Sequence, residues 1–145
     1  MAQLHEKQIE AFLPTITRWS RWKDRKKRID WPLFPGYCFV RIGPQEALPV
    51  RKCTGVVEII SNHGVLAPVP DEEVKAIRTL VTSELLYDPC PLIDVGSTVE
   101  VIRGPLRGVK GRLVRKDAHA RLVLAVNLIG LAVSVQVDAA DVRPY

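Results

Sequence analysis

Three glycines near the start of the C-terminal third lie close enough together to suggest a phosphate-binding loop. They are Gly104, Gly108 and Gly111. A phosphate loop requires the pattern G-x-x-x-x-G-K or G-x-G-x-x-G, and a helix follows it. The spacing here matches neither pattern, and the valine-rich segment that follows is typical of a strand. We therefore expect these glycines to shape turns, where positive φ or the lack of a side chain is needed.

The other residue types that commonly catalyse reactions or bind metals form no constellation. No serine lies in a nucleophile elbow. The three histidines have no clustered partners at metal-ligand spacing; they are His5, His63 and His119. The three cysteines form no CxxC pair, which favours partly buried thiols in a reducing compartment; they are Cys38, Cys53 and Cys90. We expect a cytoplasmic protein that is not an enzyme and uses no metal or cofactor.

Basic residues are concentrated in one short segment of the N-terminal half. The 145-residue chain has a net charge of +5. Trp19 and Trp22 lie within the segment and could stack on bases, while Asp24 is its only acid. Such a cluster is typical of a surface that faces DNA or RNA, although a solvated hairpin explains it equally well. The candidate nucleic-acid-binding residues are Arg18, Arg21, Lys23, Arg25, Lys26, Lys27 and Arg28.

The first 86 residues mix helical and strand patterns, which predicts an α/β or α+β domain. Residues 2–12 resemble the end of a helix, and residues 37–42 and 56–60 are expected to be strands. A further helix should begin near Asp71, a suitable N-cap followed by acidic residues and by apolar residues at helical spacing.

Residues 87–92 contain prolines and are interpreted as a linker. Beyond it, residues 93–145 show only short strand patterns separated by glycine-rich turns, which predicts a small β barrel. The expected organisation is therefore two domains, residues 1–86 and residues 93–145, that fold separately. No apolar run is long enough to span a bilayer.

The start of the predicted barrel resembles a KOW motif, which is found in NusG proteins and in several ribosomal proteins. The matching residues are the Gly-Pro turn, both later glycines and the flanking valines; they are Val101, Gly104, Pro105, Gly108 and Gly111. The first half narrows the resemblance: Pro-Leu-Phe-Pro-Gly-Tyr at residues 32–37, then Thr-Gly-Val-Val at residues 54–57, resemble the N-terminal domain of the NusG family. These segments occur in the order that the family has.

The resemblance implies an α+β protein: a NusG-type N-terminal α/β sandwich domain, followed by an SH3-like KOW barrel. Family members usually begin with a strand and a full helix, whereas residues 1–5 of this chain are expected to lie already inside that helix. The first strand is therefore expected to be missing, so that the N-terminal domain is a truncated one.

The resemblance also implies a monomeric transcription elongation or antitermination factor. In the family, the N-terminal domain docks on RNA polymerase and suppresses pausing, and the KOW domain recruits a ribosomal protein or a termination factor. Phe34, Tyr37 and Phe39 become the candidate polymerase anchors, because aromatics are frequent hot spots. Pro35-Gly36 forces a turn, so an adjacent aromatic should be displayed. Core packing is the equally weighted alternative for Tyr37 and Phe39.

Another class of protein also fits the KOW motif alone: a ribosome-associated module that binds ribosomal RNA. That alternative does not explain the Phe-Pro-Gly-Tyr segment of the first half. Within the family, the sequence is compatible with both a general factor and an operon-specific antiterminator.

Overall fold

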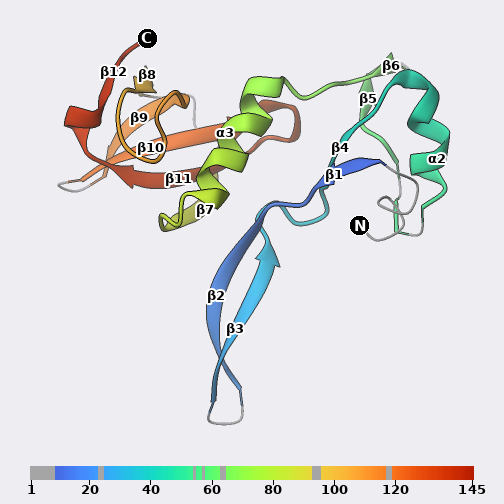
Figure 1. Ribbon diagram of the computed structural model, residues 1–145, viewed down its shortest axis with the longest axis horizontal. Coiled ribbons are helices and arrows are strands. Elements are labelled where there is room, and N and C mark those ends of the chain that lie inside the picture. The colour runs from blue at the N-terminus through green and yellow to red at the C-terminus, as the bar shows by residue number, and fades with distance from the viewer. Residues whose placement is uncertain are drawn as a thin grey trace.

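The computed structural model describes residues 9–22, 25–53, 55–56, 58–62, 65–92, 96–116 and 119–145. Its largest element is an antiparallel sheet of six strands, the C-terminal sheet, in the order β12-β8-β9-β10-β11-β7. Figure 1 shows this sheet and helix α3 on one side of the molecule and α2 on the other, with a long hairpin projecting between them. The strands of the sheet are β7 (Tyr87–Pro91), β8 (Ser97–Val101), β9 (Lys110–Lys116), β10 (His119–Val126), β11 (Leu131–Val137) and β12 (Val142–Pro144).

The strand pattern predicted for residues 93–145 is confirmed, because alternating valines and leucines point to one buried face. Val99 and Val101 on β8, Leu122 and Leu124 on β10, and Val133 on β11 are all buried. Two short 3₁₀ turns, η2 (Asn127–Ile129) and η3 (Ala139–Asp141), join the last strands. The architecture is α+β, as expected.

The segment interpreted as a linker is a strand in the structure. β7 pairs with β11, with Cys90 opposite Ala132 and Asp88 opposite Ser134. Pro89 and Pro91 cannot donate hydrogen bonds, which is tolerated because β7 is an edge strand of the sheet. Proline content therefore suggested a linker where the chain in fact completes the C-terminal sheet.

Several predictions for the N-terminal half are wrong in detail. The helix expected to end at Phe12 is a strand there, β1 (Glu10–Phe12), which pairs with β4 (Phe39–Arg41); residues 1–8 lie outside the described residues. The strand expected over 37–42 is thus only three residues long. The other elements of this region are η1 (Pro44–Glu46), α2 (Ala47–Arg51), β5 (Ser61–Asn62) and β6 (Val65–Leu66).

Residues 56–60 were expected to form a strand, but the four of them that the structure describes have no strand assignment. Val56 and Ile59 pack instead against a small cluster formed by Ile9, Val50 and Cys53. A β-branched apolar run is compatible with a partly buried loop as well as with a strand, so the pattern alone led to a wrong strand prediction. Residues 54 and 57 of the Thr-Gly-Val-Val match lie outside the described residues.

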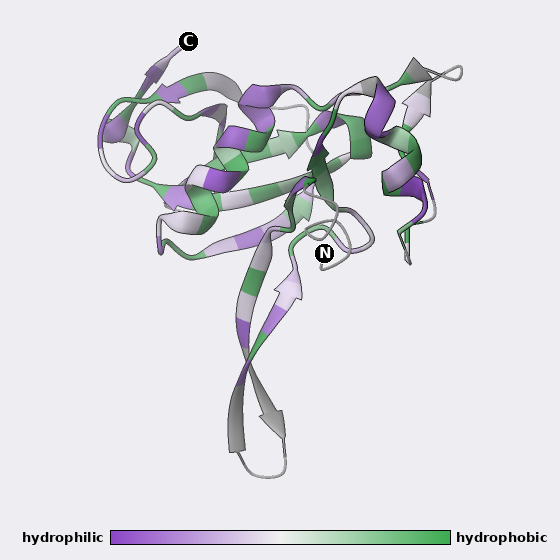
Figure 2. Ribbon diagram, turned by 45° about the vertical axis from the view of Figure 1, so that its right-hand side comes forward, coloured by the Kyte–Doolittle hydropathy of each residue, from purple (hydrophilic) through white to green (hydrophobic). Residues whose placement is uncertain are grey.

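The helix predicted to begin near Asp71 is confirmed as α3 (Asp71–Thr82), although Pro70 occupies the N-cap position. Its residues Ile77 and Leu80 are fully buried. They belong to one continuous core that also contains Phe34 and the buried residues of the C-terminal sheet. Figure 2 shows hydrophobic bands on α3 and on the strands that it covers. The two parts of the chain therefore share a core in this structure.

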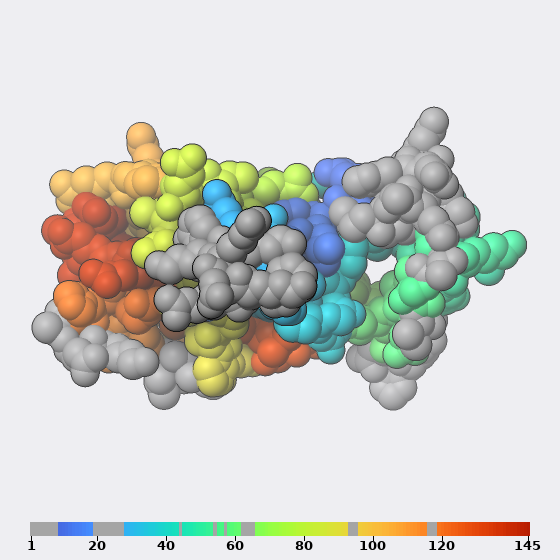
Figure 3. Space-filling model, turned by 90° about the horizontal axis from the view of Figure 1, so that it is seen from below, coloured from blue at the N-terminus to red at the C-terminus, as the bar shows by residue number. Residues whose placement is uncertain are grey.

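The basic segment forms a hairpin of two eight-residue strands, β2 (Thr15–Trp22) and β3 (Arg25–Pro32). The pairing runs in register from Thr15 opposite Pro32 to Trp22 opposite Arg25. Figure 1 shows the hairpin extending well beyond the rest of the molecule, and in the view from below in Figure 3 its coloured base lies between the C-terminal sheet and the α2 region.

Candidate nucleic-acid and polymerase interface

The projecting hairpin carries the sequence-predicted cations along both of its strands. Arg18 lies opposite Ile29, and Arg28 lies opposite Trp19. The side chain of Arg18 is half exposed, and Arg28 is exposed. For Arg21, Arg25, Lys26 and Lys27 the structure describes only the backbone, and Lys23 lies outside the described residues. The backbone thus brings six of the seven predicted residues onto one hairpin, including the two whose side chains are described.

The base of the hairpin is tied to the edge strand β7. The guanidinium of Arg18 lies 2.8 Å from Oδ1 of Asp88. The hydroxyl of Tyr87 donates a 2.7 Å hydrogen bond to the carbonyl oxygen of Thr15. Burial and the nearby Asp30 carboxylate raise the pKa of Tyr87, so its hydroxyl keeps the proton that it donates. These contacts fix the direction in which the hairpin leaves the body of the protein.

Asp88 also contacts a second arginine, which comes from the C-terminal sheet. The Arg121 guanidinium lies 3.5 Å from Oδ2 of Asp88. It also donates hydrogen bonds to the hydroxyl and the carbonyl oxygen of Ser134, at 3.1 and 3.2 Å. One carboxylate is therefore shared between arginines of β2 and β10. Neither Asp88 nor Arg121 was identified from the sequence, because Asp88 lay in the predicted linker and no local pattern links the two residues.

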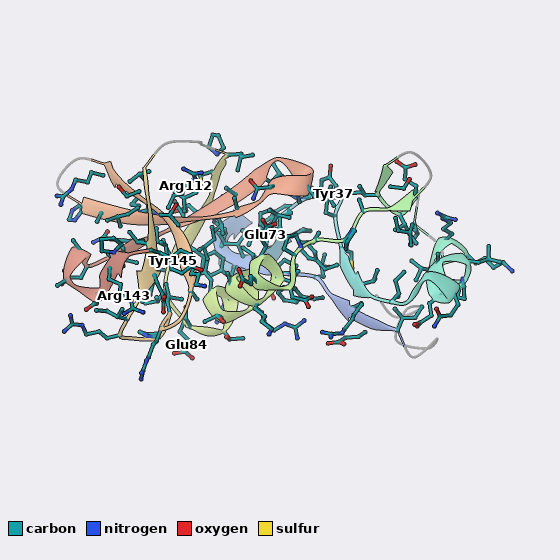
Figure 4. The ribbon with its side chains drawn as sticks, turned by 90° about the horizontal axis from the view of Figure 1, so that it is seen from above. Tyr37, Glu73, Glu84, Arg112, Arg143 and Tyr145 are labelled. Carbon is teal, nitrogen blue, oxygen red and sulfur yellow. The ribbon has the colours of Figure 1, made fainter. Side chains whose placement is uncertain are left out.

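The three candidate polymerase anchors have different environments. Phe34 is only 2% exposed, although a displayed aromatic was expected next to the Pro35-Gly36 turn. Its ring meets Phe39 edge-on at 6.3 Å, and Phe39 stacks on Phe12 at 6.1 Å. Phe39 is partly buried against the shared core. The displayed aromatic is Tyr37, which is 37% exposed and lies between the C-terminal sheet and the α2 region (Figure 4).

The turn itself explains that difference. Gly36 has φ of +85°, a conformation that suits glycine, and the amide of Tyr37 donates a 3.1 Å hydrogen bond to the carbonyl oxygen of Phe34. The turn therefore sends Tyr37 outward while Phe34 remains in the core.

The KOW residues form the turn between β8 and β9. Val101 accepts a hydrogen bond from the amide of Gly108 and donates one to Val109, at 2.8 and 2.9 Å. Gly104 and Gly108 both have φ of +90°. A Cβ on Gly111 would lie 2.7 Å from the carbonyl oxygen of Val123 on the neighbouring strand. Pro105 is exposed in the same turn. These residues thus have structural roles, in the manner predicted for the glycines.

Two properties of the described part of the chain bear on other classes of function. None of the helices described here has the length and apolar character to cross a membrane. The described histidine, cysteine, aspartate and glutamate side chains form no group of three or more that could hold a metal ion.

Comparisons with known proteins agree on the relationship. The family model described as "Transcription termination factor nusG" matches residues 1–78. The "Transcription termination/antitermination protein NusG" of Lactococcus lactis subsp. lactis (strain IL1403) is 24% identical over 141 residues, covering 92% of this chain and 74% of that protein. A structure titled "Domain interaction in Thermotoga maritima NusG" superposes with a TM-score of 0.53 at 21% identity, covering 99% of this chain and 85% of that one. The chain therefore belongs to the NusG family of transcription termination and antitermination factors.

Proposed function

We propose that this chain binds RNA polymerase through its N-terminal half, contacts nucleic acid through the β2–β3 hairpin, and recruits a second protein through its KOW domain in the cytoplasm. It acts as a monomer and modulates pausing and termination. The observation that carries the proposal is the long basic hairpin, which projects from the same half of the chain as the Phe-Pro-Gly-Tyr turn (Figure 1). Family membership favours this role over a ribosomal one.

The shape of the hairpin supports contact with nucleic acid. A two-stranded ribbon that extends away from the body can follow a groove or a single strand, whereas charges on a compact surface reach fewer phosphates. Arg18 and Arg28 lie on different strands of the ribbon, so both strands can contribute phosphate contacts. The shared ladder of backbone hydrogen bonds holds these cations in a fixed order.

The burial of Phe34 imposes a condition on polymerase binding. Phe34 lies in a core to which the C-terminal sheet contributes. In this structure Tyr37 is therefore the accessible aromatic of the turn. A role for Phe34 as an anchor requires the residues that bury it to move away, since its side chain is 2% exposed. Tyr37 can make first contact without that movement, since its side chain already reaches solvent.

The polymerase role is tested with purified core RNA polymerase from the source organism and the full chain. Truncating an interface aromatic typically costs 2 kcal/mol or more, about a thirtyfold loss of affinity. We expect that loss for Tyr37→Ala with a nearly unchanged thermal melt. Leu128→Ala is the matched control, because Leu128 is 39% exposed on η2, the turn between β10 and β11. Equal binding by both variants and the wild type would remove Tyr37 from the polymerase surface.

The nucleic-acid role is tested by the salt dependence of binding to a labelled oligonucleotide. The variant Lys26→Gln/Lys27→Gln/Arg28→Gln should bind more weakly at low salt. Its dependence of log affinity on log salt should fall by about 0.7 to 0.9 for each phosphate that the variant no longer binds. An unchanged affinity and slope would assign the three side chains to solvent.

A further inference from the structure

The carboxylate of Asp88 occupies a position that resembles a bound anion. Arg18 approaches Oδ1 from the hairpin at 2.8 Å, and Arg121 approaches Oδ2 from β10 at 3.5 Å. Two guanidinium groups therefore face one carboxylate. Asp30, the other carboxylate near the hairpin base, accepts a hydrogen bond from Thr17 on the opposite strand. Arg18, Arg121 and Asp88 together carry an excess of one positive charge, which the nearby Asp30 carboxylate, the one that raises the pKa of Tyr87, reduces.

Arg121 is held in place by more than Asp88. Its Nε and one terminal nitrogen are bound to Ser134, whose side chain is buried beneath it. Its own side chain is 22% exposed, against 52% for Arg18. An arginine that is fixed by its neighbours loses little conformational freedom when it binds a ligand. The remaining donors of both guanidinium groups match an anion with two oxygens, such as a carboxylate or a phosphate.

The arginine pair Arg18 and Arg121 lies at the base of the hairpin, between the hairpin and the C-terminal sheet. Arg18 is one of the hairpin cations, whereas Arg121 belongs to the C-terminal sheet. A strand of nucleic acid that followed β2 towards the hairpin base would reach Arg18 and then Arg121. Asp88 lies between them and is half exposed, so its carboxylate can be displaced without opening the core.

We infer that Arg18 and Arg121 form a phosphate-binding site for single-stranded nucleic acid that spans the two parts of the chain, and that Asp88 is its built-in competitor. A backbone phosphate replaces the Asp88 carboxylate between the two guanidinium groups. The site is complete only while the hairpin base lies against the C-terminal sheet, since each part supplies one arginine. The inference rests on the proposed nucleic-acid role of the hairpin and extends the binding surface onto the C-terminal sheet.

The experiment measures the affinity of the full chain for a short fluorescein-labelled oligothymidylate across a salt series. Asp88→Asn keeps the shape of the side chain and removes its charge. It should tighten binding about two- to fivefold, the change that corresponds to one exposed ion pair. Arg121→Gln should weaken binding and lower the salt slope by about 0.7, the value for one phosphate contact on a single strand.

The matched control is Arg143→Gln. Arg143 is an exposed arginine of the same sheet and also pairs with a carboxylate at 3.5 Å, that of Glu100; Figure 4 shows it on the sheet. This variant removes the same charge and should retain the wild-type salt slope. Arg121→Lys separates folding from recognition, because it keeps the charge without the planar fork; it should recover part of the affinity. Thermal melts of all variants identify any loss of folding.

The outcomes separate this site from the hairpin role. In a double-mutant cycle, Arg18→Gln and Arg121→Gln should be non-additive, because both remove the same phosphate contact. If Arg28→Gln weakens binding while Arg121→Gln behaves like Arg143→Gln, the hairpin role stands and the shared site is wrong. If neither Arg28→Gln nor Arg121→Gln changes affinity, both proposals fail. Weaker or unchanged binding by Asp88→Asn would contradict the competitor role.

Discussion

Glu73 on α3 binds Asn127 of the turn η2 through both of its carboxylate oxygens. Oε1 accepts a 3.3 Å hydrogen bond from the backbone amide of Asn127, and Oε2 accepts a 2.8 Å bond from its side-chain amide. Figure 4 shows Glu73 on the helix facing the sheet. Because the two residues are 54 positions apart in the chain, these bonds join the N-terminal half to the C-terminal sheet at its turn η2.

Removing the Glu73 carboxylate should loosen the packing of α3. Glu73→Ala should lower the free energy of unfolding by about 1 kcal/mol, a value reduced by the solvent exposure of the pair. Glu72→Ala is the control, because both residues are acidic and lie in the first turn of α3, so the loss of favourable charge near the helix N-terminus is the same. Urea unfolding measures both variants, and equal destabilisation would show that the bonds to Asn127 contribute nothing.

Phe34 should behave as a core residue, as its burial in this structure indicates. Its truncation to alanine should lower stability by about 3 to 5 kcal/mol, because the phenyl ring leaves a cavity in a well-packed core. Tyr37→Ala should cost less than about 1 kcal/mol, since its side chain is partly solvated. Thermal unfolding of the two variants under one set of conditions provides the comparison. A normal melt for Phe34→Ala would contradict the observed burial.

Substituting either of two KOW-turn glycines by alanine should lower the stability of the protein, by different amounts and for different physical reasons. Gly111→Ala should cost about 1 to 3 kcal/mol, because its Cβ would lie 2.7 Å from a backbone oxygen that cannot easily move. Gly104→Ala meets open space and should cost about 1 kcal/mol through its positive φ. Chemical denaturation gives the order of the two effects. A larger loss of stability at Gly104 would show that backbone conformation outweighs the close approach.

Glu84 is a non-glycine residue with positive φ, at +64°, immediately after the C-cap of α3. Glycine is preferred at this position, since it adopts the left-handed conformation without strain. Glu84→Gly should therefore raise the free energy of unfolding by a few tenths to about 1 kcal/mol. Lys75→Gly, an exposed site inside the same helix, should instead lower it by about 1 kcal/mol. Destabilisation by both variants would mean that the Glu84 side chain makes a contribution that offsets its backbone strain.

The KOW domain is expected to fold by itself, and its N-terminal boundary can be tested with fragments. A fragment of residues 87–145 includes β7, whereas a fragment of residues 93–145 leaves β11 as an exposed edge. We expect dispersed amide signals from the longer fragment and a melting temperature at least about 4 °C above that of the shorter one, the shift that about 1 kcal/mol produces in a domain of this size. Identical melts would place the boundary where the sequence suggested it.

The sequence by itself determined the elements whose residue pattern is local. Alternating valines and leucines predicted the strands of the C-terminal sheet, and apolar spacing after acidic residues predicted α3. Gly104 and Gly108 of the KOW turn were interpretable for the same reason, because a positive φ is a property of a single position. Family membership was also accessible from short motifs, since their order along the chain is itself a sequence property.

Only the tertiary structure decided which residues meet across the two parts of the chain. Asp88 acquired its partners Arg18 and Arg121, and β7 became an edge strand, through contacts between segments far apart in sequence. The burial of Phe34 within the shared core also depends on contacts between segments far apart in sequence. A proline-rich segment can be a linker or an edge strand, and an aromatic beside a turn can be exposed or buried. Which of these occurs depends on the surface that packs against the segment.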